Sequence, residues 1–424
     1  MQTTSASIPT RSNVSCFRTR HRLTGLGLCL VMLLSACSGS GSGGSSFTPP
    51  GAPEDAGACR YVLEDDITSP TRLINTDSNC DYLLDGWVEV SSLLQIEPGV
   101  VVRATADARL VIEGGELSAI GTAQQRIVME GLSHVSGFWR GINVNSARNI
   151  AFDFFDMRDG GQVCSILFCP DVGLMVDNTR LSFTHSSVSN SYVIGMSITG
   201  DVEIDAFANN RFFGNSLHGL AVDGNNIPGL DENSDYRGIG DENGIVGVGV
   251  HNGDQTRGEI FQWKKINAPY LINGYYNVSG GTLLLDPGVE LAFDEGAWFV
   301  VEGNGVFKAL GTAAEPIIIR GQQARPGYWD GIRFEESPWD SNILEHVVLS
   351  HSGNTEGLLS AYAAINLDES HVSVSNTTFK DNSRWAIVCN EPDYPYEPSV
   401  ITDGGGNTFS NNESGDIDSD CTVR

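Results

Sequence analysis

An internal repeat is the feature of this sequence that most restricts its fold. Residues 95–142 and residues 284–332 contain the motifs PGV, EG, GT and WxGI in the same order. The offset between the motifs is 189 residues, and it becomes 190 after one inserted residue. Weaker matches on both sides extend the two copies. The sequence therefore predicts two duplicated halves, at about residues 59–250 and 251–424.

The repeated unit is made of short segments with strand chemistry. Triplets such as VVV at 100–102 and LVI at 110–112 are β-branched or apolar and are bounded by Gly, Asp, Asn or Ser. No long stretch keeps the i, i+3, i+4, i+7 spacing of an amphipathic helix. Asn-Gly hairpin turns are sparse, which disfavours a sandwich, and four-stranded blades of about 40–45 residues do not recur as in a propeller. We therefore expect an all-β fold, a right-handed parallel β-helix (β-solenoid).

Asparagine marks the expected corners of this β-helix. The pattern Asn-x-Phe-x-x-Asn occurs at 210–215 and again at 407–412. Asparagine tolerates the left-handed backbone region, and its amide group can bond to an equivalent Asn on the next rung. We expect these residues to line tight corners between strands.

A resemblance supports the same fold. The order PGV, strand, GxLxAxGT, strand, WxGI stands here with ELSAIGT at 116–122 and VFKALGT at 306–312. It resembles exported bacterial right-handed β-helix proteins of the pectin-lyase-like superfamily. The resemblance implies the fold, but it leaves the activity open, because lyases, hydrolases, adhesins and surface proteins share it.

The first 36 residues predict export. Four arginines and no acidic residue precede an apolar run of twelve at 23–34, which suits a signal peptide better than a membrane anchor. Leu-Ser-Ala-Cys at 34–37 resembles the lipobox of bacterial lipoproteins, which implies that Cys37 is lipidated. Ser38 then implies the outer membrane. Residues 37–58 are rich in Gly, Ser and Pro and predict a flexible tether.

The remaining cysteines agree with export. Six follow Cys37, and an even number in an exported chain predicts disulfides. Neighbours in the sequence suggest three pairs, although six cysteines allow 15 connectivities. The pairs are Cys59 with Cys80, Cys164 with Cys169, and Cys389 with Cys421.

One acidic segment is a candidate calcium site. Asp231, Asn233, Asp235 and Glu242 occupy positions 1, 3, 5 and 12 of an EF-hand-like loop. Tyr236 stands where the loop needs Gly, and no helices are expected on either side. A different Ca²⁺ loop and a solvated insertion at the boundary between the halves both remain open.

Catalytic motifs are incomplete. A polygalacturonase-like set is broken, because Asn75-Thr76-Asp77 lies before the expected rungs and His218-Gly219 lacks the preceding Gly. Asp153, Asp156 and Asp159 beside Arg158 resemble a lyase cluster only loosely, since approximate alternation need not put the acids on one face. We assign no catalytic residue.

Aromatic residues offer a binding alternative. Trp139, Trp329 and Trp339 lie near strand starts, with Tyr328 beside the second, and such side chains can stack on sugar rings. Because two of the tryptophans belong to the repeated WxGI motif, packing against the next rung is the favoured interpretation for them.

Three functions follow as hypotheses. The first is a non-catalytic surface or periplasmic protein, anchored to the membrane by its lipid, that binds or adheres to glycans or to another envelope protein. The second is a polysaccharide lyase or glycoside hydrolase with an unfamiliar site, and the third is a structural spacer. The net charge of −28 disfavours a nucleic-acid partner. The side chains on the lateral groove of the β-helix should decide among them.

Overall fold

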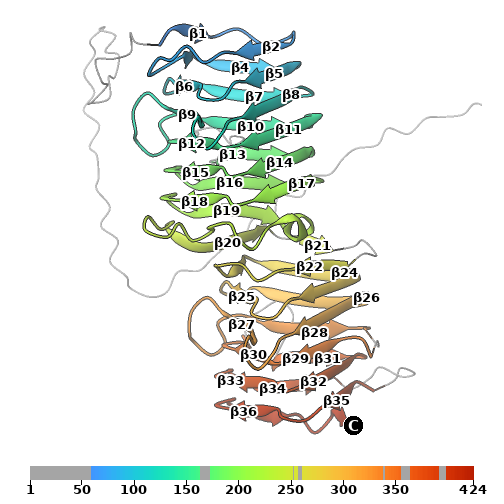
Figure 1. Ribbon diagram of the computed structural model, residues 1–424. Coiled ribbons are helices and arrows are strands. Elements are labelled where there is room, and N and C mark those ends of the chain that lie inside the picture. Colours follow the sequence, from blue (N-terminus) through green and yellow to red (C-terminus); the bar gives the residue numbers. More distant parts are fainter. Residues whose placement is uncertain are drawn as a thin grey trace, which may run out of the picture. The chain divides into compact units, whose positions relative to one another are not determined.

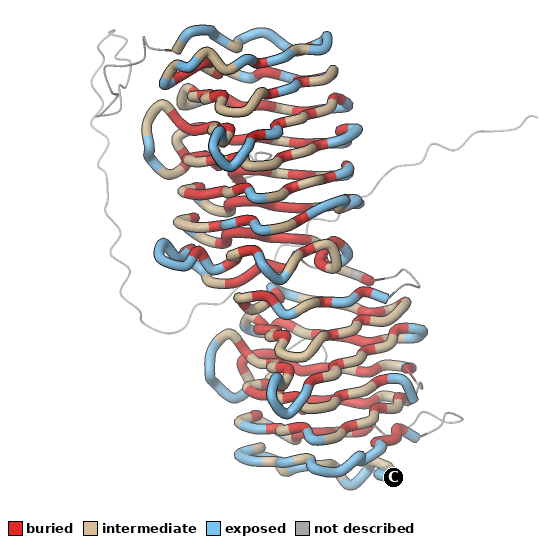
Figure 2. Tube along the Cα trace, in the orientation of Figure 1, coloured by how far each residue is buried: buried red, intermediate tan, exposed pale blue. Residues whose placement is uncertain are grey.

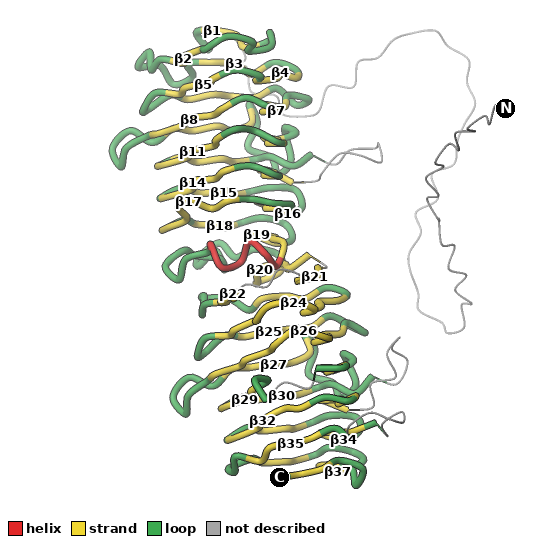
Figure 3. Tube along the Cα trace, turned by 90° about the vertical axis from the view of Figure 1, so that its right-hand side faces the viewer, coloured by secondary structure: helices red, strands yellow, loops and turns green. Residues whose placement is uncertain are grey.

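The computed structural model describes residues 59–162, 172–251, 253–255, 260–337, 340–354, 363–390 and 398–424. These residues form 38 strands, β1 to β38, and one short 3-10 helix, η1 (Gly224–Gly229), shown in red in Figure 3. Every pairing between these strands is parallel. The expectation of an all-β fold with parallel strands is confirmed.

The strands form four sheets, named A to D (Figure 1). Sheet A consists of β1 (Tyr61–Leu63), β3 (Tyr82–Leu84), β6 (Val101–Ala104), β9 (Ile127–Gly131), β12 (Phe155–Arg158), β15 (Ser187–Ser189) and β18 (Arg211–Phe213). Sheet C consists of β2 (Thr71–Leu73), β5 (Leu93–Ile96), β8 (Glu116–Ile120), β11 (Asn149–Asp153), β14 (Arg180–Thr184) and β17 (Glu203–Ala208).

The other two sheets are larger. Sheet B consists of β4 (Trp87–Val90), β7 (Arg109–Glu113), β10 (Gly141–Asn145), β13 (Val172–Asp177), β16 (Ile194–Thr199), β19 (His218–Asp223), β20 (Ile245–His251), β23 (Tyr270–Ile272), β25 (Glu290–Phe293), β27 (Ile317–Gly321), β30 (Val347–Ser350), β33 (Thr378–Lys380) and β36 (Thr408–Ser410). Sheet D consists of β21 (Gly253–Gln255), β22 (Ile260–Trp263), β24 (Tyr275–Leu285), β26 (Trp298–Leu310), β28 (Gly331–Glu335), β29 (Ile343–Glu345), β31 (Ala363–Asp368), β32 (His371–Ser375), β34 (Trp385–Cys389), β35 (Val400–Asp403), β37 (Gly415–Ile417) and β38 (Thr422–Val423).

The chain visits the sheets in turn. It passes through β7 in sheet B, β8 in sheet C and β9 in sheet A, and β10 then returns to sheet B beside β7. Each coil of chain in this part of the structure adds one strand to each of three sheets. This order of stacked parallel strands is that of a parallel β-helix.

The second half of the chain uses the sheets differently. The repeat matches Tyr82 in β3, a strand of sheet A, with Tyr270 in β23. However, β23 continues sheet B, where Tyr270 lies opposite Val248 of β20. In sheet D, the long strands β24 and β26 each occupy the place of two successive strands of a coil. They pair with each other, with a register shift between Val278 and Gly280. Strands that match in sequence therefore lie in different sheets.

The core lies between the sheets, and buried residues alternate with less buried ones along many strands (Figure 2). In β11, Ile150 and Phe152 are buried between exposed or half-buried neighbours. Phe152 lies in register with Phe183 of the next rung, and their ring centroids are 5.7 Å apart. Fully burying one such side chain contributes about 1.5–3 kcal/mol to the free energy of unfolding. The inward residues of each rung are therefore its main source of stability.

The tryptophans of the two WxGI motifs are core residues. Trp139 and Trp329 have no exposed surface. Each indole N–H donates to a backbone carbonyl, Trp139 to Arg158 at 2.7 Å and Trp329 to Ser350 at 2.9 Å. The packing interpretation is therefore confirmed for both, while Trp339 lies outside the described residues.

Asparagine side chains join neighbouring rungs at the corners. The amide of Asn215 donates to Asn243 at 2.9 Å, and the amide of Asn382 donates to Asn412 at 2.8 Å. Asn209 has φ 56°, in the left-handed region that its short polar side chain tolerates. The predicted role of asparagine in the corners is confirmed.

Two of the predicted disulfides are present. Cys59 is bonded to Cys80, and Cys389 is bonded to Cys421, across sequence separations of 21 and 32 residues. Cys164 and Cys169 lie outside the described residues, as does Cys37.

Candidate functional site

The outer face of sheet A presents a polar surface set by strand register. Asp156 of β12 lies opposite Ser187 of β15, which lies opposite Arg211 of β18. Two positions further along each strand, Arg158, Ser189 and Phe213 form a second column. Because side chains alternate along a strand, these two columns point away from the core together.

A groove of about 480 Å³ runs along these columns. We call it the arginine groove, because three of its lining residues are arginines. Its lining residues are Arg126, Asp156, Arg158, His185, Ser186, Ser187, Ser189, Asn209, Arg211 and Phe213. The lining carries three guanidinium groups and one carboxylate, an excess of positive charge within a chain of net charge −28.

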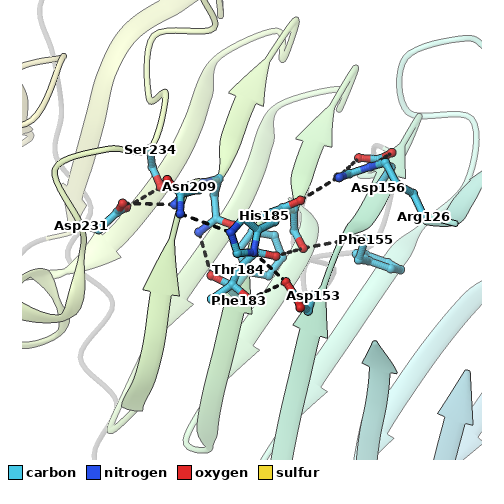
Figure 4. A network of polar contacts seen from close by, with 12 residues as sticks. Arg126, Asp153, Phe155, Asp156, Phe183, Thr184, His185, Asn209, Asp231 and Ser234 are labelled. Atoms are coloured by element: carbon cyan, nitrogen blue, oxygen red, sulfur yellow. Dashed lines mark hydrogen bonds and ion pairs between the residues drawn. The ribbon is translucent and has the colours of Figure 1, made fainter. Parts of the chain in front are cut away.

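Asp156 lines the groove and is held as a fixed anion, and Figure 4 shows Arg126 bonded to it. Arg126 donates two hydrogen bonds to its carboxylate, at 2.8 and 2.7 Å, and the Ser187 hydroxyl donates a third. Burial acts to raise the pKa of Asp156, but these hydrogen bonds outweigh burial and hold the pKa below its ordinary value. Asp156 is therefore ionised at neutral pH and has no proton to give.

His185, another lining residue of the groove, is fixed at a corner of the chain by the contacts drawn in Figure 4. Its Nδ1 lies 2.9 Å from a carboxylate oxygen of Asp153, and its ring stacks on Phe154 with centroids 4.6 Å apart. Its backbone has φ 47°, and its carbonyl accepts a hydrogen bond from Arg126 at 2.8 Å. These contacts orient the imidazole and tie the corner to the arginine of the groove.

The other two arginines of the groove are partly exposed to solvent. The side chains of Arg158 and Arg211 are 43% and 44% exposed. The nearest carboxylate oxygens to the Arg158 guanidinium, from Glu130 and Asp156, are 3.6 and 4.0 Å away, longer than a charge-assisted hydrogen bond. Arg211 lies over the ring of Phe213, with its guanidinium carbon 4.1 Å from the centroid. Its Nη2 donates to the Ile239 carbonyl at 2.7 Å, and its Nε lies 3.5 Å from an Asp235 carboxylate oxygen. Both side chains line the groove and keep part of their guanidinium surface exposed.

A larger hollow in the second half of the chain lacks this charge pattern. It has a volume of about 600 Å³, and its charged lining residues are Glu295, Glu413, Arg325 and Arg384. Two carboxylates balance two guanidinium groups there. The excess of guanidinium groups over carboxylates among the lining residues, and not the volume, distinguishes the arginine groove as the candidate site.

Three of the four predicted calcium ligands, Asp231, Asp235 and Glu242, already interact with groups of the protein. The Asp231 carboxylate accepts hydrogen bonds from the backbone N–H of Asn209 and Asn233. Asp235 accepts three backbone N–H groups, from residues 237 to 239, and Glu242 lies 3.7 Å from Arg237. In the described part of the chain, no group of three or more His, Cys, Asp or Glu residues is arranged to hold a metal ion. The structure does not bring these four side chains together as a Ca²⁺ site.

The three aspartates compared with a lyase cluster do not form one. Asp153 ends β11 in sheet C, and Asp156 lies on the outer face of sheet A. Asp159 is 2% exposed, and burial raises the pKa of its carboxyl although Asn190 and His134 bond to it. Of the lyase candidates, only Asp156 and Arg158 line the arginine groove.

The remaining hydrolase-like motifs have structural roles. Thr76 donates its backbone N–H to the Asp81 carboxylate at 2.8 Å, which fixes a turn before β3. His218 is a buried residue of β19 in sheet B. Neither residue lines the arginine groove.

Sequence reasoning missed the arginine groove, although one signal was present. Residues 59–250 contain eleven arginines and no lysine, and the first lysine of the chain is Lys264. Arginine binds planar anions bidentately and stacks on aromatic rings, so such a bias favours anion recognition over general solubility. The pairing of Arg126, Arg158 and Arg211 across rungs depends on register, which the sequence did not provide.

Comparison with models of known protein families, with curated proteins and with solved structures found no match. Within the described residues, no helix is both long enough and apolar enough to cross a membrane.

Proposed function

We propose that this protein is a lipid-anchored, non-catalytic right-handed parallel β-helix, derived by internal duplication, that binds an acidic polysaccharide of the cell envelope. The observation that carries the proposal is the excess of guanidinium groups in the arginine groove. The proposed ligand is a glycan chain bearing carboxylate or sulfate groups. Anchoring through Cys37 to the outer membrane, facing either the periplasm or the cell surface, would hold the groove close to such a ligand.

The charge of the whole chain makes this recognition short-ranged. A net charge of −28 repels a polyanion at a distance, so the on-rate gains nothing from long-range steering. Affinity must come from direct contact with Arg158 and Arg211, whose planar groups match a carboxylate or sulfate. Phe213 beside Arg211 adds an aromatic surface on which a sugar ring can lie.

The same geometry favours binding over catalysis. Lyases and glycosidases need a base or a paired acid and base beside the scissile bond. Asp156 is bound by Arg126 and Ser187 and keeps a low pKa. His185 is fixed between Asp153 and Asn209. We therefore rank a polysaccharide-active enzyme below a binding protein.

The first prediction concerns the groove. Arg158→Ala combined with Arg211→Ala should lower the affinity for an acidic oligosaccharide at least tenfold, because each substitution removes an exposed guanidinium donor. Isothermal titration calorimetry with oligogalacturonate and with dextran sulfate at constant ionic strength measures the effect. Arg148→Ala is the matched control, since Arg148 is 61% exposed and belongs to the same half of the chain but is absent from the groove lining.

The outcomes separate the three functions. Loss of affinity in the double variant but not in the control supports the arginine groove. Equal affinity in all three proteins contradicts it. Cleavage of the oligosaccharide by the wild-type protein would favour the enzyme, and absence of binding to any acidic glycan would favour a spacer.

The second prediction concerns the anchor. Cys37→Ser should release the protein from membranes into the soluble fraction, because the lipobox-like segment at 34–37 would lose the thiol that accepts the lipid. Membrane fractionation with detection of the protein measures this, and Cys29→Ser in the apolar run is the control. A Cys37→Ser protein that stays with the membrane would contradict lipid anchoring.

A further inference from the structure

We propose a second glycan-binding site, on the outer face of sheet B, where Trp87 and Arg109 bind one sugar ring that carries a carboxylate. Trp87 of β4 lies opposite Arg109 of β7, and Arg109 lies opposite Gly141 of β10. The Arg109 guanidinium carbon is 5.4 Å from the centroid of the indole. The site is on a different sheet from the arginine groove and shares no residue with its lining.

Trp87 provides an open aromatic surface. The residue is 57% exposed, and among the described aromatic residues only Tyr61 and Tyr192 are also strongly exposed. Trp139 and Trp329 are fully buried, as core packing requires. An exposed indole on a strand adds no burial to the core, but its face can stack against the C–H groups of a sugar ring.

Arg109 is a buried cation that needs a partner. The residue is only 5% exposed, and its buried Nε has no hydrogen-bond partner among the described residues. The nearby carboxylate of Asp107 accepts instead from Arg140, at 3.0 Å. Burial lowers the pKa of Arg109, and the neighbouring charge of Arg140 lowers it further. Since buried charges in proteins are normally paired, an anion from a ligand is the missing partner.

The two groups together define the class of ligand. Neighbouring rungs are about 4.8 Å apart, so the indole and the guanidinium group can contact a ring and its own substituent at once. A guanidinium group binds a carboxylate through two parallel hydrogen bonds. A hexuronate, whose carboxylate is attached directly to the ring, satisfies both groups. This inference extends the proposed glycan binding to a second face, and it can stand or fall without the arginine groove.

The second copy of the repeat provides an internal comparison. The positions matching Trp87 and Arg109 are Tyr275 and Trp298, which lie opposite each other in β24 and β26. Their rings stack with centroids 5.0 Å apart. The aromatic character is therefore retained, but the cation is replaced. We assign the preference for a carboxylate to the first copy alone.

The experiment uses the full chain carrying Arg158→Ala and Arg211→Ala, so that binding through the arginine groove is removed. Into this parent, Trp87→Ala, Arg109→Gln or Tyr275→Ala is introduced. The probes are oligogalacturonate, its methyl ester and dextran sulfate, with affinity measured by calorimetry. Thermal melts verify that each variant is folded, and Trp87→Ala alters only an exposed side chain.

The expected result is a tenfold or greater loss of affinity for oligogalacturonate with Trp87→Ala and with Arg109→Gln, and no change with Tyr275→Ala. The methyl ester should bind equally weakly to the parent and to the Arg109→Gln variant. Unchanged affinity in both the Trp87 and the Arg109 variants overturns the site. Tighter binding of dextran sulfate than of oligogalacturonate overturns the assignment of a carboxylate. If the parent binds as tightly as wild type while Trp87→Ala does not, the arginine groove fails and this site stands.

Discussion

Replacing Cys389 and Cys421 together with alanine should destabilise the C-terminal coil by about 3–4 kcal/mol. This value is the chain-entropy estimate for a closed loop with a sequence separation of 32 residues. The effect should be local, because strands at the end of a stack of rungs have one neighbour instead of two. We expect β37 and β38 to lose order while the preceding rungs remain folded.

The contacts of this coil explain why the disulfide is needed. β38 has two residues and pairs only with β35. Its neighbour β37 pairs only with β34, and Ile417 is the sole large apolar residue between positions 411 and 420. Cys389 is 3% exposed and belongs to the core, so the bond connects the poorly buried end of the chain to a well-packed strand.

Hydrogen exchange measured by mass spectrometry tests this prediction. Peptides covering residues 408–424 should exchange faster in the double alanine variant, whereas peptides from β7 to β19 should be unchanged. Cys59→Ala with Cys80→Ala is the matched control, because that bond closes a loop at the N-terminal end of the described chain. Unchanged protection at the C-terminus, or equal loss from both double variants throughout the protein, would contradict a local clamp.

Local features of the fold were predictable from the sequence. Segments such as VVV and LVI carry their strand preference in the residues themselves. The corner asparagines and the end disulfides were also identified, because backbone tolerance and sequence proximity are local properties. The packing role of Trp139 and Trp329 followed from their repetition, since equivalent positions in stacked coils serve stacking first.

Features that depend on register were not predictable. The sequence repeat gave no sign that Tyr82 and Tyr270 would lie in different sheets, Tyr82 in sheet A beside β1 and Tyr270 in sheet B beside β20. The same limit hid the arginine groove, whose lining residues are up to 87 positions apart, from Arg126 to Phe213. The acidic segment matched a Ca²⁺ loop by spacing, but its carboxylates bond to nearby backbone N–H groups. Spacing along the chain does not give the direction of a side chain.

Asp330→Asn should stabilise the protein by about 3 kcal/mol at pH 7 and leave it unchanged near pH 3. Asp330 has no exposed surface, and burial raises the pKa of its carboxyl to about 6 from an ordinary 3.8, although the side chain of Asn354 acts in the opposite direction. One pKa unit corresponds to about 1.4 kcal/mol, which gives the magnitude. The asparagine has nearly the same shape but cannot ionise.

The sign follows from linkage between protonation and folding. Well below pH 3.8 the Asp330 carboxyl is protonated in both the folded and the unfolded chain. Ionisation of Asp330 then takes nothing from the free energy of unfolding. Between pH 3.8 and about 6 the unfolded chain ionises while folded Asp330 keeps its proton, so the stability of the wild type falls. Above about pH 6 Asp330 is ionised in both the folded and the unfolded chain, and the loss of free energy of unfolding reaches a plateau.

Urea unfolding at a series of pH values measures this difference directly. The free energies of unfolding of wild type and Asp330→Asn should coincide near pH 3 and separate between about pH 4 and 6. Asp77→Asn is the control, because Asp77 is exposed and its φ of 56° is one that asparagine tolerates. That variant should follow the wild-type curve. A constant difference between wild type and Asp330→Asn at every pH would mean that packing, and not ionisation of a buried carboxyl, separates the two proteins.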